Sequence, residues 1–204
     1  MKTIGYFGDS FCAGRESESW CVLLSKKLNA NIVYWGEPGR SVWTSMIKFN
    51  RLNQQGRLPD ICIFCWSEPY RLYHPSLILS ANTQPLPEVD PRVYKALDDY
   101  WKYLHSYEKD ELVYEYSIKW FDQNILSNID KKIIQMWSFK PFETANKNID
   151  IHLTTGTFIN ESMFAFSKKD GVEPGGWGPG TINHMTIEQN KQWAEKVYER
   201  YKLS

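Results

Sequence analysis

The 204-residue sequence has no apolar run long enough to cross a membrane and no surplus of charge of either sign. A spanning helix needs ~20 mostly apolar residues, and the N-terminal residues 1–6 lack the apolar segment of a secretory signal. We therefore expect a soluble protein made in the cytoplasm, with no membrane partner. The 24 Lys and Arg residues balance 24 Asp and Glu residues. Because nucleic-acid binding usually requires a basic surplus, we expect no nucleic-acid partner.

Several ligand-binding motifs are also missing. The sequence has neither the GxGxxG pattern of dinucleotide sites nor the GxxxxGK pattern of phosphate-binding loops, which disfavours a nucleotide or phosphate binder. Its four histidines show no HxxH or HxxxH spacing, so we expect no metal site and no cofactor. Aromatic residues, in contrast, make up 15% of the chain, and a surplus of this kind often lines a concave site.

Cysteine is scarce, with four residues: Cys12, Cys21, Cys62 and Cys65. Cys62 and Cys65 form a CxxC motif, which occurs in metal and redox sites. They lie within an unbroken apolar run, however, and residues three apart in a strand point to opposite faces. We therefore interpret them as small buried side chains, and predict no disulfide framework, as suits a reducing compartment.

The first third of the chain alternates apolar runs with helical patterns. Apolar runs predict strands, and helical spacing predicts helices: strands at residues 3–7, 31–35 and 61–66, and helices at 19–28 and 41–52. This order predicts a doubly wound α/β fold with a parallel sheet. In such a fold the loops that follow the strands meet at one edge of the sheet, where we expect the functional site.

The rest of the chain predicts further elements of one domain spanning residues 1–204. These are helices at 93–104 and 111–126, a fourth strand at 131–137 and a short fifth strand near 149–153. We interpret residues 72–127 as an excursion and residues 138–180 as a loop-rich segment that ends in a glycine-rich stretch. Thr186 and Gln189 form a capping-box pattern that predicts the start of a final helix.

Ser10 directly follows the first predicted strand, in the turn Gly8-Asp9-Ser10-Phe11. A serine hydroxyl is a weak nucleophile unless a nearby base accepts its proton. His184, which stands just before the final helix, is the favoured base, and His74 after the third strand is the alternative. His105 lies on a predicted helix and is interpreted as a packing or surface residue.

These motifs together resemble the SGNH (GDSL) hydrolase superfamily. The resemblance rests on Gly8-Asp9-Ser10-Phe11, on Gly36-x-x-Gly39-x-Ser41 after the second strand and on the late histidine, in that order, from residue 5 to about 195. It implies a flavodoxin-like three-layer α/β/α fold with about five strands, and lipase, esterase or carbohydrate deacetylase activity. It also implies that Ser10 is the nucleophile, that His184 is the base and that the backbone N–H groups of Ser10 and Gly39 stabilise the oxyanion.

The sequence departs from that family in two places. The expected Gly-x-Asn-Asp block is replaced by Trp66-Ser67-Glu68-Pro69-Tyr70-Arg71. The Ser67 hydroxyl is then the remaining side-chain donor, and Glu68 would repel an oxyanion unless it were protonated or paired, for example with Arg71. Arg71 has a second interpretation, as a surface ion-pair residue. The segments Trp66-Ser67-Glu68-Pro69-x-Arg71 and Asn183-His184-Met185-Thr186 resemble a divergent branch of this superfamily found in phage and bacterial genomes. Association with a phage is therefore compatible with the sequence.

The second departure concerns the acid of the family's Asp-x-x-His block. Thr181 stands three residues before His184, and the adjacent Asn183 carries no charge. The resemblance then implies a Ser–His dyad or an incomplete triad, with the imidazole oriented by a backbone carbonyl. Asp9 is interpreted either as a turn or cap residue or as an acceptor that ties neighbouring loops together.

Two hypotheses about function follow. The leading hypothesis is a serine ester hydrolase, of the esterase or carbohydrate O-deacetylase type, acting on a small acyl ester or an acylated carbohydrate. Because loss of the acid from a triad costs about 10⁴ in rate, the alternative is a weak or inactive module that keeps the fold and binds a glycan or a protein.

Overall fold

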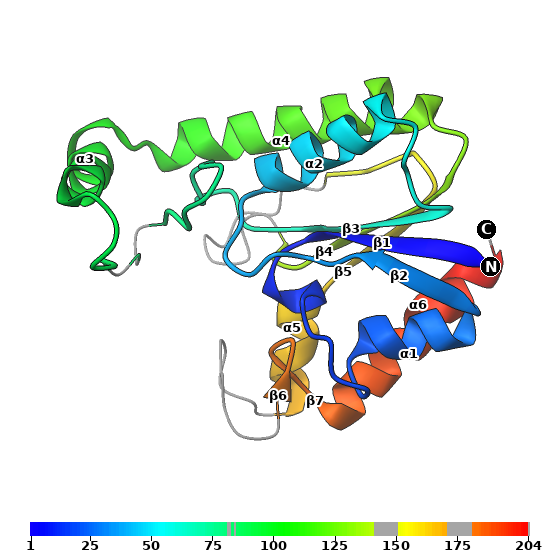
Figure 1. Cartoon of the computed structure of the whole chain (residues 1–204). Coiled ribbons are helices and arrows are strands. Elements are labelled where there is room, and N and C mark those ends of the chain that lie inside the picture. The colour runs from blue at the N-terminus through cyan, green and yellow to red at the C-terminus, as the bar shows by residue number, and fades with distance from the viewer. Residues whose placement is uncertain (81–82, 84, 141–150, 171–180, 204) are drawn as a thin grey trace.

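A five-stranded parallel sheet forms the centre of the molecule (Figure 1). The computed structural model describes residues 1–80, 83, 85–140, 151–170 and 181–203. The strands are β1 (Lys2–Gly8), β2 (Ala30–Tyr34), β3 (Ile61–Trp66), β4 (Lys132–Trp137) and β5 (Thr157–Ser162). Their order is β2-β1-β3-β4-β5, and every neighbouring pair is parallel. The predicted α/β class is confirmed, and this is the strand order of flavodoxin-like sheets.

Two helical layers cover the two faces of this sheet (Figure 1). On one face lie α1 (Trp20–Lys27) and α6 (Ile187–Leu203), and on the other lie α2 (Val42–Gln54) and α4 (Tyr107–Asn124). Each layer has its own buried cluster, one around Trp20 and Trp193 and the other around Phe49 and Phe121. The arrangement is therefore a three-layer α/β/α sandwich.

Strand β3 shows why the sheet needs both layers. Its six residues are all buried, and successive side chains point to opposite faces, as pleating requires. Cys65 joins the cluster under α1 and α6, whereas Cys62 joins the cluster under α2 and α4. The prediction that the CxxC cysteines point to opposite faces is confirmed, and all four cysteines are buried and free.

The shorter elements complete the described chain. They are α3 (Pro91–Asp99), α5 (Met163–Ser167), β6 (Thr181–Ile182), β7 (Met185–Thr186), 3₁₀ turns at Ser10–Cys12, Leu126–Asn128 and Lys168–Asp170, and a π-helical turn at Tyr100–Leu104. Strands β6 and β7 form a small antiparallel hairpin directly before α6. No helix among the described residues is long and apolar enough to cross a membrane.

The capping box predicted for the last helix is confirmed. The Thr186 N–H donates to Gln189 Oε1 at 2.9 Å, and the Gln189 N–H donates to Thr186 Oγ1 at 3.1 Å. Gln189 Nε2 also donates to the Ser167 carbonyl at 3.0 Å, which fixes the start of α6 against the end of α5. The hairpin that precedes α6 is thereby held in one place.

The fifth strand was predicted at the wrong position. Of the predicted residues 149–153, positions 149 and 150 lie outside the described residues and 151–153 are not strand. Ile151 and Leu153 are instead buried under α2 and α4 without pairing to the sheet, and β5 begins after Gly156. Gly156 has a φ of +69°, and a Cβ there would lie 2.2 Å from the Ile133 carbonyl oxygen. The turn that leads into β5 therefore requires a glycine at this position.

The helix predicted at 93–104 also differs in the structure. It consists of α3 followed by the π-helical turn, and only Leu97 of its apolar stripe is buried. Figure 1 shows α3 standing away from the sheet. Because α3 lies away from the sheet, its apolar stripe has little to pack against. The helical periodicity therefore predicted a helix but not a buried one. The predicted helix at 111–126 begins earlier, where Ser106 caps α4 by accepting the Lys109 N–H at 3.3 Å.

We expect the four thiols to be unreactive in the folded protein. Burial raises the pKa of Cys62 to about 12 and raises the pKa values of Cys21 and Cys65 well above their usual range, so the reactive thiolate is scarce. An aromatic disulfide reagent at neutral pH should label none of the four within minutes. It should label all four after unfolding in guanidinium, and rapid labelling of the native protein would contradict the packing described for the two faces.

Candidate active site

The candidate site lies where the strand order reverses direction. From β1 the chain first adds β2 on one side and then returns to place β3 on the other side, so the loops after β1 and β3 diverge at one edge of the sheet. Such a switch point at the carboxyl ends of parallel strands is the usual ligand site of open α/β sheets. Asp9 and Ser10 follow β1, and Ser67 and Glu68 follow β3. The structure thus brings these two groups of predicted residues to the same edge.

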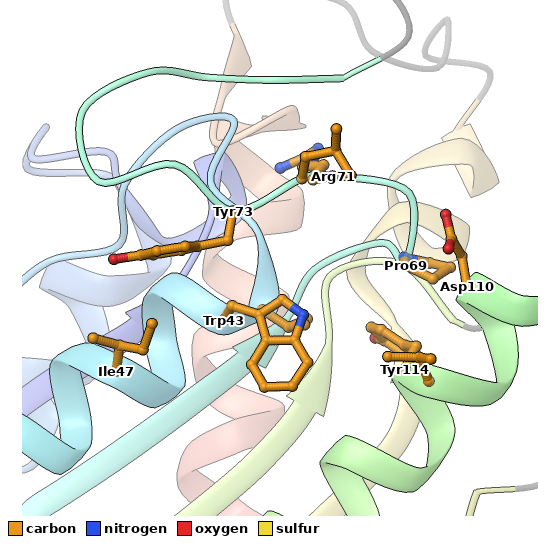
Figure 2. A pocket seen from close by; sticks show the side chains of 10 residues that line it. Trp43, Ile47, Pro69, Arg71, Tyr73, Asp110 and Tyr114 are labelled. Atoms are coloured by element: carbon orange, nitrogen blue, oxygen red, sulfur yellow. The ribbon is translucent and has the colours of Figure 1, made fainter. Parts of the chain in front are cut away.

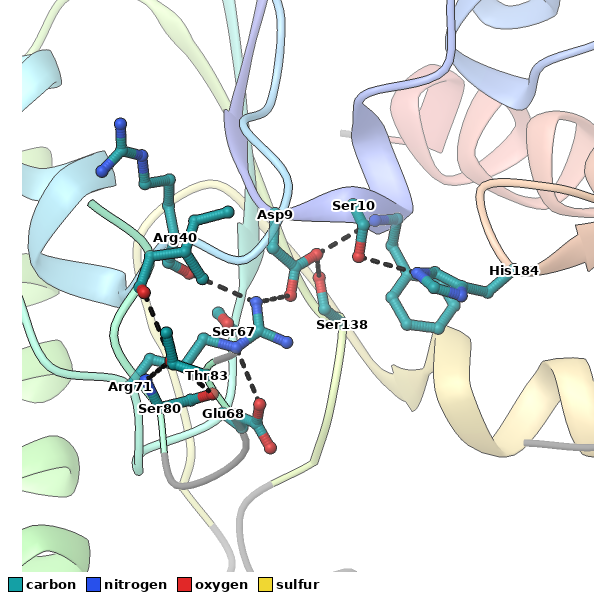
Figure 3. Close-up of polar contacts among 12 residues, drawn as sticks. Asp9, Ser10, Arg40, Ser67, Glu68, Arg71, Ser80, Thr83, Ser138 and His184 are labelled. Atoms are coloured by element: carbon teal, nitrogen blue, oxygen red, sulfur yellow. Dashed lines mark hydrogen bonds and ion pairs between the residues drawn. The ribbon is translucent and has the colours of Figure 1, made fainter. Parts of the chain in front are cut away.

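Ser10 and His184 face each other across this edge (Figure 3). His184 Nε2 lies 2.8 Å from Ser10 Oγ, although 174 positions separate the two residues in the chain. Ser10 begins a single 3₁₀ turn, and its side chain is largely buried. This distance is within the range over which a base accepts the proton of a nucleophilic hydroxyl.

The β6–β7 hairpin presents His184 to Ser10. Its two central residues, Asn183 and His184, have φ angles of +54° and +61°. Two positive φ values are what a two-residue type I′ turn requires. The left-handed conformation costs a non-glycine residue about 1–2 kcal/mol, and Asn and His are among the side chains that tolerate it best. His184 is therefore held in a strained position that the surrounding contacts must stabilise.

Asn183 supplies two of those contacts. Its Oδ1 accepts the Gly14 N–H at 2.6 Å, and its Nδ2 donates to Ser19 Oγ at 3.0 Å. Both partners lie in the loop between Ser10 and α1. Asn183 therefore ties the hairpin to the segment that follows the serine. Both hydrogen bonds use the amide and require no charge, so Asn183 can support the hairpin without a carboxylate.

Asn190 reinforces the same connection, and the sequence analysis missed it. From the first turn of α6, its Oδ1 accepts the Trp20 N–H at 2.9 Å, and its Nδ2 donates to the carbonyls of Ile182, Met185 and Thr186 at 2.9–3.2 Å. One buried amide thus fixes the start of α1 and both strands of the hairpin. The signal available in the sequence was its spacing, three and four positions before Trp193 and Ala194 on the buried face of α6.

Asp9 is a fully buried carboxylate beside the serine. Its Oδ1 accepts the Phe11 N–H at 3.1 Å and the Ser138 hydroxyl at 2.8 Å. Ser138, which directly follows β4, was also missed by the sequence analysis. Both interpretations of Asp9 find support in these contacts, because it caps the turn that carries Ser10 and joins that turn to the end of β4.

Arg71 carries the positive charge nearest to Asp9. Its Nε lies 2.7 Å from Glu68 Oε1, and its Nη1 lies 3.4 Å from both Asp9 Oδ2 and the Arg40 carbonyl (Figure 3). The predicted Glu68–Arg71 pair is present, so the Glu68 charge is compensated. The Arg71 side chain is 10% exposed, which places this arginine inside the site rather than on the outer surface.

The surroundings of His184 act on its pKa in opposite directions. Burial lowers the pKa of the imidazole below its ordinary value of 6.5; the Asp9 carboxylate raises this pKa and the Arg71 guanidinium lowers it. The ring also packs against Phe11, with ring centroids 4.9 Å apart. The direction of the shift means that His184 is neutral, and able to accept a proton, at neutral pH.

Three predicted oxyanion donors have distinct environments. The backbone N–H groups of Ser10 and Gly39 donate no hydrogen bond to another described residue. Gly39 has a φ of +71°, in the turn before α2, where a side chain would be strained. The Ser67 hydroxyl is buried and has no hydrogen-bond partner among the described residues. All three donors are thus unused within the described part of the chain, and their catalytic role stays a prediction.

The remaining histidines have other surroundings. His74 Nδ1 accepts the N–H groups of Ser76 and Leu77 at 3.1 and 2.9 Å, so this alternative base closes its own turn. His105 is buried among aromatic rings and pairs with Asp110 at 3.2 Å, in agreement with a packing role. Among the described residues no group of His, Cys, Asp and Glu side chains is arranged to hold a metal ion. The glycine-rich stretch at 175–180 lies outside the described residues.

Comparison with known proteins adds a distant structural likeness. No protein-family model and no curated protein sequence matches this chain. Among solved structures, the chain is similar to the psychrotrophic esterase EstA from Pseudoalteromonas sp., in a structure inhibited by monoethylphosphonate. The two proteins are 13% identical, the match covers 100% of this chain and 98% of that chain, and the TM-score is 0.48. The roles of the residues described above are therefore inferred from their own geometry.

The strained hairpin gives a test by unfolding. We expect His184→Asn to change the free energy of unfolding by less than about 1 kcal/mol, because Asn tolerates a positive φ. His184→Val should cost about 1–2 kcal/mol more, because a branched Cβ does not tolerate it. Urea unfolding followed by tryptophan fluorescence measures both, and an equal cost for Asn and Val would contradict the described turn.

Proposed function

We propose that this protein is a serine ester hydrolase that uses a Ser–His dyad or an incomplete triad. The observation that carries the proposal is the 2.8 Å contact between Ser10 Oγ and His184 Nε2, formed by two residues from opposite ends of the chain. A strained backbone at His184 supports it, because strain of this kind persists where the surrounding structure is built to hold a side chain in place.

The first half of the reaction would acylate the serine. His184 Nε2 accepts the Ser10 proton as Oγ attacks the ester carbonyl, giving a tetrahedral intermediate with a negatively charged oxygen. The N–H groups of Ser10 and Gly39 are the proposed donors to that oxygen, with the Ser67 hydroxyl as a third. One such donor is worth ~3 kcal/mol of transition-state stabilisation. The intermediate then collapses, the alcohol leaves with the proton held by His184, and an acyl-serine remains.

The second half reverses these roles with water. His184 accepts a proton from a water molecule, the resulting hydroxide attacks the acyl-serine carbonyl, and the tetrahedral intermediate again releases Ser10 Oγ. The proton on His184 returns to that oxygen, and the carboxylic acid leaves. Because no step requires a redox group or an additional reactant, the proposed chemistry needs no cofactor.

Asp9 and Arg71 are the proposed supporting residues. Asp9 holds the turn that carries Ser10, and its charge raises the pKa of His184, which favours the imidazolium that forms during the reaction. Arg71 pairs with Glu68 and so limits the repulsion between that carboxylate and an oxyanion. The substrate we propose is an ester of a small acyl group, on a simple alcohol or on a carbohydrate.

A covalent probe tests the proposal directly. A fluorophosphonate reagent should label the wild-type protein, and Ser10→Ala should abolish labelling and reduce hydrolysis of p-nitrophenyl acetate to the uncatalysed background, because the attacking oxygen is gone. Ser76→Ala, which alters an exposed serine, is the matched control and should behave as wild type. Absence of labelling in the wild-type protein would contradict the hydrolase and favour the inactive module that binds a glycan or a protein.

The pH dependence of hydrolysis tests His184 as the base. We expect kcat/KM for a neutral ester to rise with pH through one inflection below 6.5 and then to level off, because only the neutral imidazole accepts a proton. Asp9→Asn removes the charge that raises the pKa of His184, so its inflection should move to lower pH. Arg71→Gln removes a charge that lowers this pKa, so its inflection should move to higher pH. Inflections that do not move in these opposite directions would exclude His184 as the titrating base.

A further inference from the structure

A separate cavity of about 250 Å³ opens beside the candidate active site (Figure 2). It lies between the first turns of α2 and α4 and the segment that follows β3. Trp43 and Ile47 line it from α2, Val113 and Tyr114 line it from α4, and Arg71 and Tyr73 line it from the segment after β3. Because it is bordered by the carboxyl end of β3, the cavity belongs to the same edge of the sheet as Ser10.

Arg71 and Tyr114 connect this cavity to the reactive residues. Arg71 lines the cavity, and its Nη1 lies 3.4 Å from Asp9 Oδ2, directly before Ser10 in the chain. Tyr114 also lines the cavity and donates its hydroxyl hydrogen bond to the Ser67 carbonyl at 2.6 Å. A molecule that occupied the cavity would therefore lie against the Arg71 side chain, which also contacts Asp9 next to Ser10.

The lining of the cavity favours an apolar occupant. Eight of its ten lining residues are apolar or aromatic, and the other two are Arg71 and Asp110. Both charged groups already have partners, since Arg71 pairs with Glu68 and Asp9, and Asp110 pairs with His105 and Lys109. A sugar ring would need several polar groups for its hydroxyls, and few remain here. An alkyl chain or an aromatic ring needs none.

The size of the cavity and the exposure of its aromatic side chains also favour an apolar occupant. Sites for whole small molecules usually enclose ~300–1,000 Å³, so a cavity of about 250 Å³ suits one part of a substrate. Trp43 and Tyr73 are 39% and 42% exposed. An apolar group placed between them would remove this aromatic surface from water, which is favourable.

We propose that this cavity binds the apolar group of the ester, an alkyl chain or a single aromatic ring, while the ester bond lies at Ser10. The inference rests on the proposed function, and it narrows the substrate from small acyl esters in general to esters that carry such a group. Arg71 then has a second role, as a side chain that borders both the apolar subsite and Asp9 next to Ser10.

The experiment compares short and long esters in matched variants. Val113 lines the cavity, whereas its neighbour Leu112 does not, and both are 45% exposed on α4. Val113→Trp should fill the cavity and lower kcat/KM for ethyl hexanoate or for benzyl acetate about tenfold or more relative to kcat/KM for ethyl acetate, which carries neither an alkyl chain of that length nor an aromatic ring. Leu112→Trp should leave all three values within twofold of wild type. Trp43→Ala, which removes one wall of the cavity, should also lower kcat/KM for the same larger ester relative to kcat/KM for ethyl acetate.

The outcomes separate this inference from the proposed function. If the wild-type protein hydrolyses ethyl acetate but the Val113 and Trp43 variants change the preference for neither larger ester, the cavity is not the subsite and the proposed function stands. If the wild-type protein hydrolyses none of the three esters and takes up no fluorophosphonate, the proposed function is wrong and the subsite falls with it. A selective loss for one larger ester also identifies which side of the ester bond occupies the cavity.

Discussion

The arrangement of the site depends on the left-handed backbone at Asn183 and His184. This conformation costs a typical non-glycine residue about 1–2 kcal/mol, and Asn and His tolerate it better than most. Other contacts nevertheless stabilise the turn. The Asn183 amide bonds the loop after Ser10, and the Asn190 amide bonds both hairpin strands and the start of α1. Because these contacts join the first 20 residues to the last 25, the 2.8 Å distance between Ser10 and His184 depends on the packing of α1 against α6.

The strand order determines what surrounds this pair of residues. Because β3 lies next to β1, residues that are 62 positions apart, Asp9 and Arg71, form a partly buried ion pair at the same edge. Burial of a carboxylate without a partner would be costly, and Asp9 has Ser138, the Phe11 N–H and Arg71 as partners. The loop after β4 is thereby included in the site, since Ser138 follows that strand. Three successive strands of the sheet thus contribute to the environment of one carboxylate.

Sequence patterns were sufficient where one physical cause dominated. Strands such as β3, buried on both faces, and helices such as α6, with a capping box, carry strong apolar and local signals, and both were found close to their observed bounds. The edge strand β5 is partly exposed, and Phe158 and Ile159 are its only apolar residues. The nearby Ile151 and Leu153 gave a stronger apolar signal, so the strand was predicted there instead. The β6–β7 hairpin has strands of two residues each, too short for any periodicity to be visible. Asn190 and Ser138 act through tertiary hydrogen bonds, and a local pattern can place such a residue on a buried face without identifying its partners.

The carboxylate of a catalytic triad has two functions, and in the proposed enzyme different groups supply them. Such a carboxylate orients the imidazole and stabilises its protonated form. In this chain the strained turn and the Phe11 ring both constrain where the imidazole lies. The charge stabilisation comes from Asp9, which raises the pKa of His184, but burial outweighs that effect and the net shift is downward. A weaker base that is neutral over a wider pH range is the expected consequence, since a lower pKa increases the neutral fraction and decreases the driving force for proton transfer. The proposed enzyme therefore depends more on the placement of its base than on the strength of that base.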